Sequence, residues 1–248
     1  MILTCLIVLD WNQLCDSGTL REYLTAPGHS VSLAKALWVM RQLLSAVGYL
    51  HCEGFIHRDI KPSNIFLHSG LLKIGDFGCS RAVVQAEAPP TATRLGPVLS
   101  VHNLLERLDD DVQNDPMRSM TSGVGTSVYA APEQLAGSRY DVSCDVFSIG
   151  IVFFELLHAP FATAAERAHV LTALRKGALA QEVIRGYPSQ ATVIQQMVCG
   201  DPQHRPTITE LASYVDQWIS ELDKNDSVQI ENGESKVQSP FSINHSVS

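Results

Sequence analysis

The sequence predicts an α+β fold that is mainly helical, and three features carry this prediction. Two short apolar runs, 64–67 and 71–74, flank a glycine-containing turn and indicate a β-hairpin. Residues 30–51 repeat apolar side chains at helical spacing, which is typical of an amphipathic helix packed on a core. Residues 146–157 are apolar on every side, so we expect a buried helix that forms the central pillar of the fold.

The chain ahead of the hairpin contains one turn and two helices. Residues 16–18 read as a turn and residues 19–24 as a short helix. Either Ser30 or Ser32 can cap the long helix that runs to His51. Its apolar face consists of Leu33, Leu37, Met40, Leu44, Val47 and Leu50. We expect that face to lie in the core.

The hairpin brings two polar positions together. Pairing Leu67 with Leu71 places Asn64 opposite Ile74, so Asp76 lies two residues beyond that pair. At ~3.3 Å per residue, the two oxygen-bearing side chains end roughly 7 Å apart along the strand. An ordinary hairpin with polar ends is the alternative.

Two segments have the composition of loosely packed chain. Residues 82–120 are rich in Ala, Pro, Thr and Asp, with one possible helical patch at 101–108. A loop of this length is uncommon inside a compact domain, so we expect a mobile insert. Residues 223–248 are Ser, Asn, Gln and charged residues with little to bury, which predicts a disordered tail.

Composition narrows the class of protein. The chain has 248 residues, 45% of them hydrophobic, which suits one or two globular domains. Its net charge of −8 argues against a protein that binds nucleic acid through phosphate contacts. Six scattered cysteines favour reduced thiols in a cytoplasmic protein. The apolar runs 1–9 and 146–157 are too short to span a bilayer, so no membrane contact is expected.

Residues 57–64 combine an acid, a base and an amide at a spacing that suits phosphoryl transfer. Asp59 can accept the proton of an attacking hydroxyl, and Lys61 can neutralise charge on the transferring phosphate. Asn64 offers an oxygen ligand to a magnesium ion. Asp76, the first residue of an Asp-Phe-Gly triplet, offers a second oxygen ligand. We therefore expect Asp59 and Lys61 to be catalytic and Asn64 and Asp76 to bind metal.

Together with Ala131-Pro132-Glu133, these motifs resemble the catalytic loop, metal-binding triplet and substrate-segment end of eukaryotic protein kinases. Residues 61–63 are similar to the serine/threonine branch. The resemblance extends over residues 10–220. It implies a kinase large (C-terminal) lobe over 16–222, with ATP and Mg²⁺ as cofactors and a protein hydroxyl as substrate.

The same resemblance makes residues 1–15 a remnant of the small lobe and hinge. Leu14, Cys15 and Phe66 would then contact the ATP. A working kinase needs a glycine-rich turn and a nucleotide-binding lysine. Lys35 is the one lysine before Asp59, and it lies inside a predicted helix. We therefore expect an incomplete catalytic domain, with dimerisation possible through the rest of the small lobe.

Four further roles follow from the resemblance. A phosphate on Thr121 would pair with Arg58 and order the segment, although an unmodified loop threonine is the alternative. Thr126 would contact the catalytic aspartate. Glu133 would form a buried ion pair with the late arginine Arg205. Asp145 would accept backbone N–H groups of the catalytic loop, the alternative being a simple helix N-cap.

Four segments resemble one subgroup, the kinases of the α subunit of eukaryotic translation initiation factor 2. They are residues 64–67, 73–78, 125–134 and 166–177. In the last segment, Thr172 and Arg175 can face outward and dock that folded substrate, whereas the alternative is a plain surface helix. Two other functions stay open: a kinase-like binding module without catalysis, and a serine/threonine kinase with another substrate.

Overall fold

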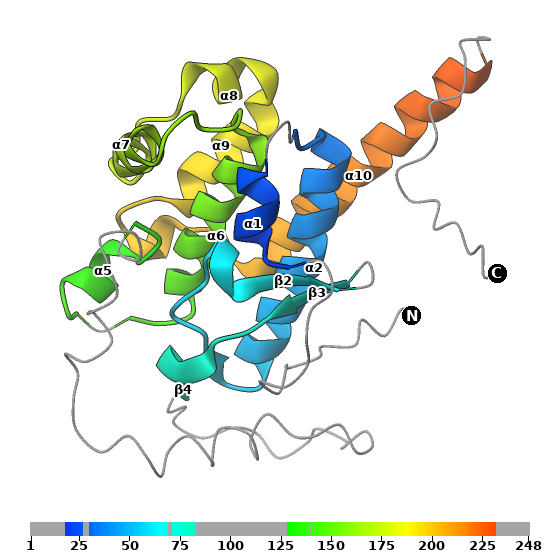
Figure 1. Ribbon diagram of the computed structural model, residues 1–248. Helices are drawn as coiled ribbons and strands as arrows, with labels where there is room; N and C mark the ends of the chain where they lie inside the picture. The colour runs from blue at the N-terminus through cyan, green and yellow to red at the C-terminus, as the bar shows by residue number, and fades with distance from the viewer. Residues whose placement is uncertain (1–17, 27–29, 69–70, 83–127, 139, 232–248) are drawn as a thin grey trace, which may run out of the picture.

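The computed structural model describes residues 18–26, 30–68, 71–82, 128–138 and 140–231 (Figure 1). The described part is mainly helical, as predicted, and it contains two small two-stranded antiparallel sheets. Four predicted functional positions, Leu14, Cys15, Thr121 and Thr126, lie outside the described residues, as does nearly all of the predicted insert.

Helix α2, Leu33–Cys52, is the predicted amphipathic helix. Its N-cap is Ser32, whose hydroxyl accepts a hydrogen bond from the backbone N–H of Lys35 at 3.3 Å. The predicted apolar face is buried from Leu37 onward, while Leu33 packs against the edge of the core. Helix α10, Ile208–Glu231, lies along α2 (Figure 1).

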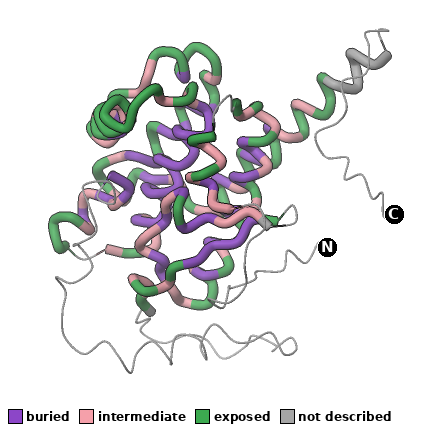
Figure 2. The backbone as a smooth tube through the Cα atoms, viewed as in Figure 1, coloured by how far each residue is buried: buried purple, intermediate pink, exposed green. Residues whose placement is uncertain are grey.

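Helix α6, Ser143–Leu157, is the predicted central pillar. Every residue from Cys144 to Leu157 is buried, and Figure 2 shows the buried backbone gathered around this helix. Helix α9, Pro188–Met197, packs closely on it. That approach depends on Gly150, since a Cβ there would lie 2.8 Å from the Cβ of Met197.

The predicted hairpin is present, but its predicted register is wrong by one residue. Strand β2, Ile65–His68, pairs with β3, Leu71–Ile74, so that Ile65 lies opposite Ile74. The reason is that His68, which the prediction left in the turn, belongs to the strand and pairs with Leu71, so that Leu67 pairs with Leu72. The backbone N–H of Gly75 donates to the Asn64 carbonyl at 2.9 Å, so Asp76 comes one residue beyond the Asn64 position instead of two. That is ~3.3 Å along the strand, half the predicted separation.

The other elements surround this frame. A second small sheet joins β1, Phe55–Ile56, which precedes the hairpin in the sequence, to β4, Arg81–Ala82, which follows it. The remaining helices and turns are α1 (Leu20–Thr25), η1 (Pro62–Asn64), η2 (Phe77–Cys79), α5 (Pro132–Leu135), α7 (Ala164–Leu174), α8 (Gln181–Gly186) and η4 (Pro202–His204). Among the described helices, none has both the length and the apolar character needed to cross a bilayer.

Helix α10 corrects the predicted start of the C-terminal tail. We expected disorder from residue 223, yet the helix continues to Glu231. Once its first turns are anchored on α2, each added residue gains a backbone hydrogen bond without a new nucleation cost. A polar composition therefore does not end the helix.

Candidate active site

Two side chains of the loop 57–64 converge on one carboxylate, that of Asp59. The Lys61 ammonium donates to Asp59 Oδ2 at 2.6 Å, and the Asn64 amide donates to the same oxygen at 3.0 Å and to the Asp59 carbonyl at 2.9 Å. The turn that begins at Pro62 folds Asn64 back onto Asp59. The structure thus brings together the two predicted catalytic residues and one predicted metal ligand.

Beneath this loop, the carboxylate of Asp145 is fully buried and accepts three hydrogen bonds. The backbone N–H groups of His57 and Arg58 donate at 2.9 and 2.8 Å, and the ring Nε2 of His51 lies at 2.8 Å. The predicted contact with the catalytic loop is therefore present. The alternative of a helix cap is excluded, because Val142 holds the N-cap position of α6 with no side-chain cap.

Asp145 also holds a strained backbone. Arg58 has φ 72°, in the left-handed region that a non-glycine residue adopts at a cost of about 1–3 kcal/mol. The two hydrogen bonds to Asp145 fix this conformation and so aim the next residue, Asp59. The strain at Arg58 therefore lowers the stability of the fold slightly, and the strained conformation sets the geometry of the loop that carries Asp59.

His57 links the catalytic loop to the strand that leads to Asp76. Its Nδ1 accepts the Asp59 backbone N–H at 3.3 Å, and its Nε2 faces the Gly75 carbonyl at 3.2 Å. These partners suit the neutral ring with its hydrogen on Nε2. Burial lowers the pKa of His57, and nearby carboxylates, Asp145 first, oppose that shift only in part. The sequence motif alone indicated no separate role for His57.

Asn64 and Asp76 are the predicted magnesium ligands. Asp76 is exposed at the end of β3 and also has a left-handed backbone, with φ 63°. Because the amide nitrogen of Asn64 is held by Asp59, its oxygen is the atom that can meet a cation. The described residues contain no group of three or more His, Cys, Asp or Glu side chains suited to a metal. A bound Mg²⁺ would therefore take its remaining ligands from phosphate and water, as this ion commonly does.

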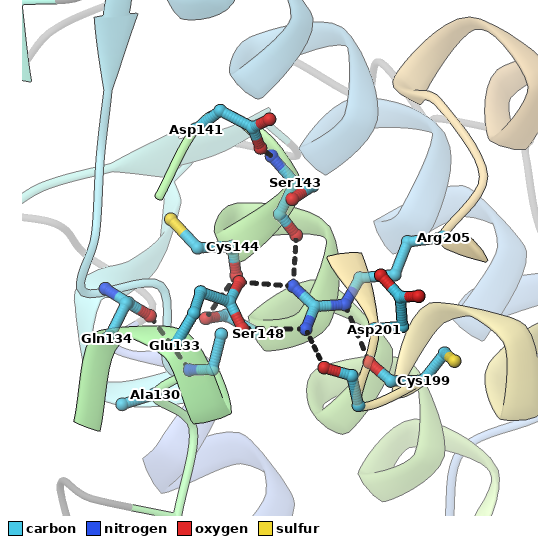
Figure 3. A network of polar contacts seen from close by, with 12 residues as sticks. Ala130, Glu133, Gln134, Asp141, Ser143, Cys144, Ser148, Cys199, Asp201 and Arg205 are labelled. Atoms are coloured by element: carbon cyan, nitrogen blue, oxygen red, sulfur yellow. Dashed lines mark hydrogen bonds and ion pairs between the residues drawn. The ribbon is translucent and has the colours of Figure 1, made fainter. Parts of the chain in front are cut away.

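The segment 128–134 is fastened to the catalytic loop. Gln134 receives the Ala131 backbone N–H at 2.8 Å and donates its own amide to the Arg58 carbonyl at 3.2 Å. The predicted ion pair is present next to it: both oxygens of Glu133 accept from Arg205, at 2.6 and 2.8 Å (Figure 3). Arg205 also donates to backbone carbonyls from two other segments, those of Cys199 and Ser143.

A second charged cluster, which we did not predict, surrounds Tyr129 of the same segment. The Tyr129 hydroxyl donates to Glu155 on α6 and accepts from Arg21 on α1 and Arg167 on α7. Both arginines also pair with Glu155, at 3.2 and 2.6 Å. Burial and the Glu155 charge raise the pKa of Tyr129 well above its usual value, so the phenol stays neutral. Henceforth these four residues are called the Tyr129 cluster.

A sequence signal for this cluster did exist. Glu155 is the one acidic residue in the apolar run 146–157. A carboxylate inside a buried helix requires hydrogen-bonding or charged partners. The sequence could therefore have predicted that Glu155 has cationic partners, but it could not have named them.

Arg175 departs from the predicted outward orientation. Its guanidinium donates to the Val128 carbonyl at 2.9 Å and to the Ala130 carbonyl, and it stacks over the Phe147 ring at 5.2 Å. Residues 128–130 form a turn and a bend, so these carbonyls have no strand partners, and an arginine just past the end of α7 can reach them. Thr172 does face outward as expected, with its hydroxyl donating to the Ala168 carbonyl.

The family of the chain follows from a comparison of sequences. The model of the protein kinase domain matches residues 6–218, so the chain belongs to the protein kinase family. It is 36% identical to eukaryotic translation initiation factor 2-alpha kinase 1 of Rattus norvegicus over 183 residues, which are 73% of this chain and 26% of that protein. It is 35% identical to eukaryotic translation initiation factor 2-alpha kinase 3 of Rattus norvegicus over 206 residues, which are 80% of this chain and 16% of that protein.

A third relative gives a similar result. The chain is 33% identical to the eIF-2-alpha kinase GCN2 of Homo sapiens over 207 residues, covering 80% of this chain and 12% of that protein. The chain therefore spans about a quarter or less of the length of these three relatives.

Proposed function

We propose that this chain is the large-lobe part of a serine/threonine protein kinase that transfers the γ-phosphate of ATP to the α subunit of translation initiation factor 2. The observation that carries the proposal is the Asp59 carboxylate, held by Lys61 and Asn64 within one loop. The substrate is suggested by relatives whose names state it, at about a third identity over most of the chain. The resemblance of residues 166–177 to the docking segment of those kinases supports the same substrate class, with Thr172 facing outward and Arg175 facing inward.

The geometry assigns a task to each side chain. Lys61 and Asn64 both donate to Asp59 Oδ2, so we assign the proton of the attacking hydroxyl to Oδ1 of the same carboxylate. Lys61 then offsets negative charge that develops on the moving phosphoryl group. Asn64 and Asp76 would hold Mg²⁺, which would neutralise phosphate oxygens, and ATP would supply the phosphoryl group and leave as ADP. His57 and Asp145 keep the loop in position for this step.

The direct test is Asp59→Asn in the full-length enzyme. The amide keeps the shape of the carboxylate but cannot take the proton, so we expect turnover to fall by about 10²–10⁴-fold with folding unchanged. Radiolabelled phosphate transfer to the purified α subunit measures the first effect, and thermal unfolding measures the second. Asp216→Asn, an exposed carboxylate on α10, is the matched control. Activity equal to the parent protein would reject Asp59 as the base.

A kinase-like binding module is the second candidate, and one observation favours it. Lys35, the one lysine before Asp59, lies on α2 with its ammonium 4.3 Å from the centre of the Tyr23 ring. It therefore has another role than binding a nucleotide phosphate. Calorimetric titration with Mg²⁺ and a non-hydrolysable ATP analogue separates the candidates, because a module without catalysis binds the α subunit and not the nucleotide.

We further infer that the protein works in the cytoplasm with reduced thiols. The four cysteines in the part of the chain that the structure describes, 52, 79, 144 and 199, are all free. Dimerisation and the phosphorylation of Thr121 stay predictions, as do the adenine contacts.

A further inference from the structure

The peptide group between Arg58 and Asp59 is held at both of its polar atoms. Its carbonyl oxygen accepts a hydrogen bond from the amide of Gln134 at 3.2 Å, and its N–H donates to Nδ1 of His57 at 3.3 Å. Among the residues that the structure describes, Gln134 is the one donor to this carbonyl. The peptide group that leads into Asp59 is therefore fixed from α5 on one side and from the catalytic loop itself on the other.

This peptide group needs a restraint because Arg58 has φ 72°, in a region that a non-glycine residue tends to leave. Asp145 holds the N–H of Arg58 and so fixes the peptide group before that residue. Its hydrogen bonds do not include the peptide group after it. Rotation about the Cα–C bond of Arg58 would turn that second peptide group and move Asp59 with it. The contacts with Gln134 and His57 oppose this rotation, and the His57 contact is long for a hydrogen bond.

A primary amide is the side-chain group that both neighbours of Gln134 require. The backbone N–H of Ala131 can only donate, so the atom that receives it at 2.8 Å is the amide oxygen. The Arg58 carbonyl can only accept, so it faces the amide nitrogen. A glutamate has two acceptor oxygens and cannot donate to the carbonyl when it is ionised, and an asparagine is shorter by one methylene. The orientation of the amide is thus set by its two partners.

Gln134 belongs to a segment that other elements hold in place. Next to it in the sequence, Glu133 pairs with Arg205 through both carboxylate oxygens, at 2.6 and 2.8 Å. The Ser148 hydroxyl on α6 donates to the Tyr129 carbonyl at 2.9 Å. Neither contact involves the catalytic loop. The Gln134 amide therefore has a position that is set independently of the loop, and it can act as a fixed support for the peptide group.

We propose that Gln134 is a positioning residue for the catalytic base: its amide holds the peptide group that joins Arg58 to Asp59 and so keeps the Asp59 carboxylate aimed at the acceptor hydroxyl. The inference rests on the proposed function and adds a residue to it. Because Gln134 acts through Asp59, its loss should slow the transfer step and leave the binding of both substrates intact. The same side chain also receives the Ala131 N–H at the start of α5, so the test has to separate these two tasks.

Two substitutions in the full-length enzyme separate them. Gln134→Glu keeps an oxygen for the Ala131 N–H but puts an acceptor against the Arg58 carbonyl, whereas Gln134→Met adds no charge and removes both hydrogen bonds. The lost donor is the change that both variants share. We expect each to lower kcat by about tenfold to a hundredfold, the effect of misplacing a reacting group by about 1 Å, with KM for ATP and for the purified α subunit unchanged. Gln195→Glu, at an exposed position on α9, is the matched control and should leave kcat unchanged.

Backbone hydrogen exchange, read by mass spectrometry on the peptides that contain residue 59, does not depend on catalysis. Without the donor, the peptide group turns more freely, so the Asp59 N–H should exchange faster in both Gln134 variants and not in Gln195→Glu. Faster exchange supports the positioning role even if the parent enzyme transfers no phosphate, a result that would reject only the proposed function.

Three results would overturn the proposal. The first is unchanged exchange at residue 59 in both variants, and the second is unchanged kcat in an enzyme that is active. The third is a fall in kcat confined to Gln134→Met, because that would make the contact with the Ala131 N–H the only task of the side chain. Thermal unfolding checks that each variant is folded, and Gln134→Glu should unfold at the temperature of the parent protein.

Discussion

Glu133 and Glu155 are both buried carboxylates that tie the segment 128–134 to the helices, yet their surroundings differ. Glu133 meets one guanidinium through both oxygens, and that arginine, Arg205, has a side chain with 0% exposure. Glu155 meets two guanidiniums and a phenol, and both guanidiniums border a cavity. The first is a closed pair with balanced charge, and the second is an open cluster with one positive charge in excess.

This difference predicts how much each carboxylate contributes to stability. The Glu133–Arg205 pair is buried and borders no described cavity, so its value lies in holding α5 to the end of α9 and η4. The Tyr129 cluster has charge that water can reach. Changes in the closed pair should therefore reduce stability most, whereas changes in the open cluster should reduce stability less.

The largest effect is expected for Arg205→Ala. Removing the guanidinium leaves Glu133 charged and buried, which costs about 3–5 kcal/mol of unfolding free energy. Denaturant unfolding followed by circular dichroism measures this cost. The double variant Arg205→Met with Glu133→Gln should recover part of the loss, because no buried charge is then left without a partner. A loss below about 1 kcal/mol for Arg205→Ala would contradict the closed-pair description.

Glu155→Gln should have a smaller effect, about 1–3 kcal/mol, which is typical of one lost charge-assisted contact. The two guanidiniums lose their anion, but their outer edges can take up water from the cavity. The same denaturant titration gives the comparison. If Glu155→Gln destabilises the protein more than Arg205→Ala does, the distinction between the two carboxylates is wrong.

A third prediction concerns the other contact that α7 makes with this segment. Arg175→Ala removes the donor to the Val128 and Ala130 carbonyls, so backbone amides in 128–131 should exchange hydrogen faster, with a stability loss of about 1 kcal/mol. Arg175→Lys should restore part of the protection, and Arg185→Ala, at an exposed position on α8, should change nothing. Hydrogen exchange read by mass spectrometry tests this. Unchanged exchange in Arg175→Ala would show that the segment does not need α7.

Local patterns predicted much of this fold. The apolar spacing in 33–50 and the apolar run 146–157 correctly predicted α2 and α6. The spacing of Asp59, Lys61 and Asn64 correctly predicted that these three side chains lie together in one loop. These features depend on residues close in sequence. A hairpin is also local, but its predicted register was wrong because His68 pairs with Leu71 and does not lie in the turn.

The features that the sequence did not predict depend on distant partners. Tyr129 meets an arginine 108 residues away and Glu155 meets the same arginine across 134 residues. No spacing rule within one helix identifies such partners. Arg175 shows the same limit, because a helix wheel places it outward while the carbonyls of another segment draw it in. Charged residues at the ends of helices are therefore the ones whose direction needs a structure.

The smallest expected effect is at His57, a buried ring whose backbone N–H donates to the buried carboxylate of Asp145. This ring is buried and neutral, and burial lowers its pKa below the usual 6.5, even with Asp145 nearby. Above pH 6.5 the ring is neutral in the folded and the unfolded chain, so it contributes no pH dependence there. As the pH falls below that value, the unfolded chain binds a proton that the folded chain excludes, and the free energy of unfolding decreases until the lowered pKa is reached.

His57→Gln removes the titrating group and keeps a donor for the Gly75 carbonyl. Denaturant unfolding of both proteins between pH 7 and pH 5 isolates the contribution of His57. We expect the parent protein to lose more stability than the variant over this interval. Parallel pH curves would mean that water or local opening protonates the ring in the folded state, and that the catalytic loop is less tightly closed than its contacts with Asp145 imply.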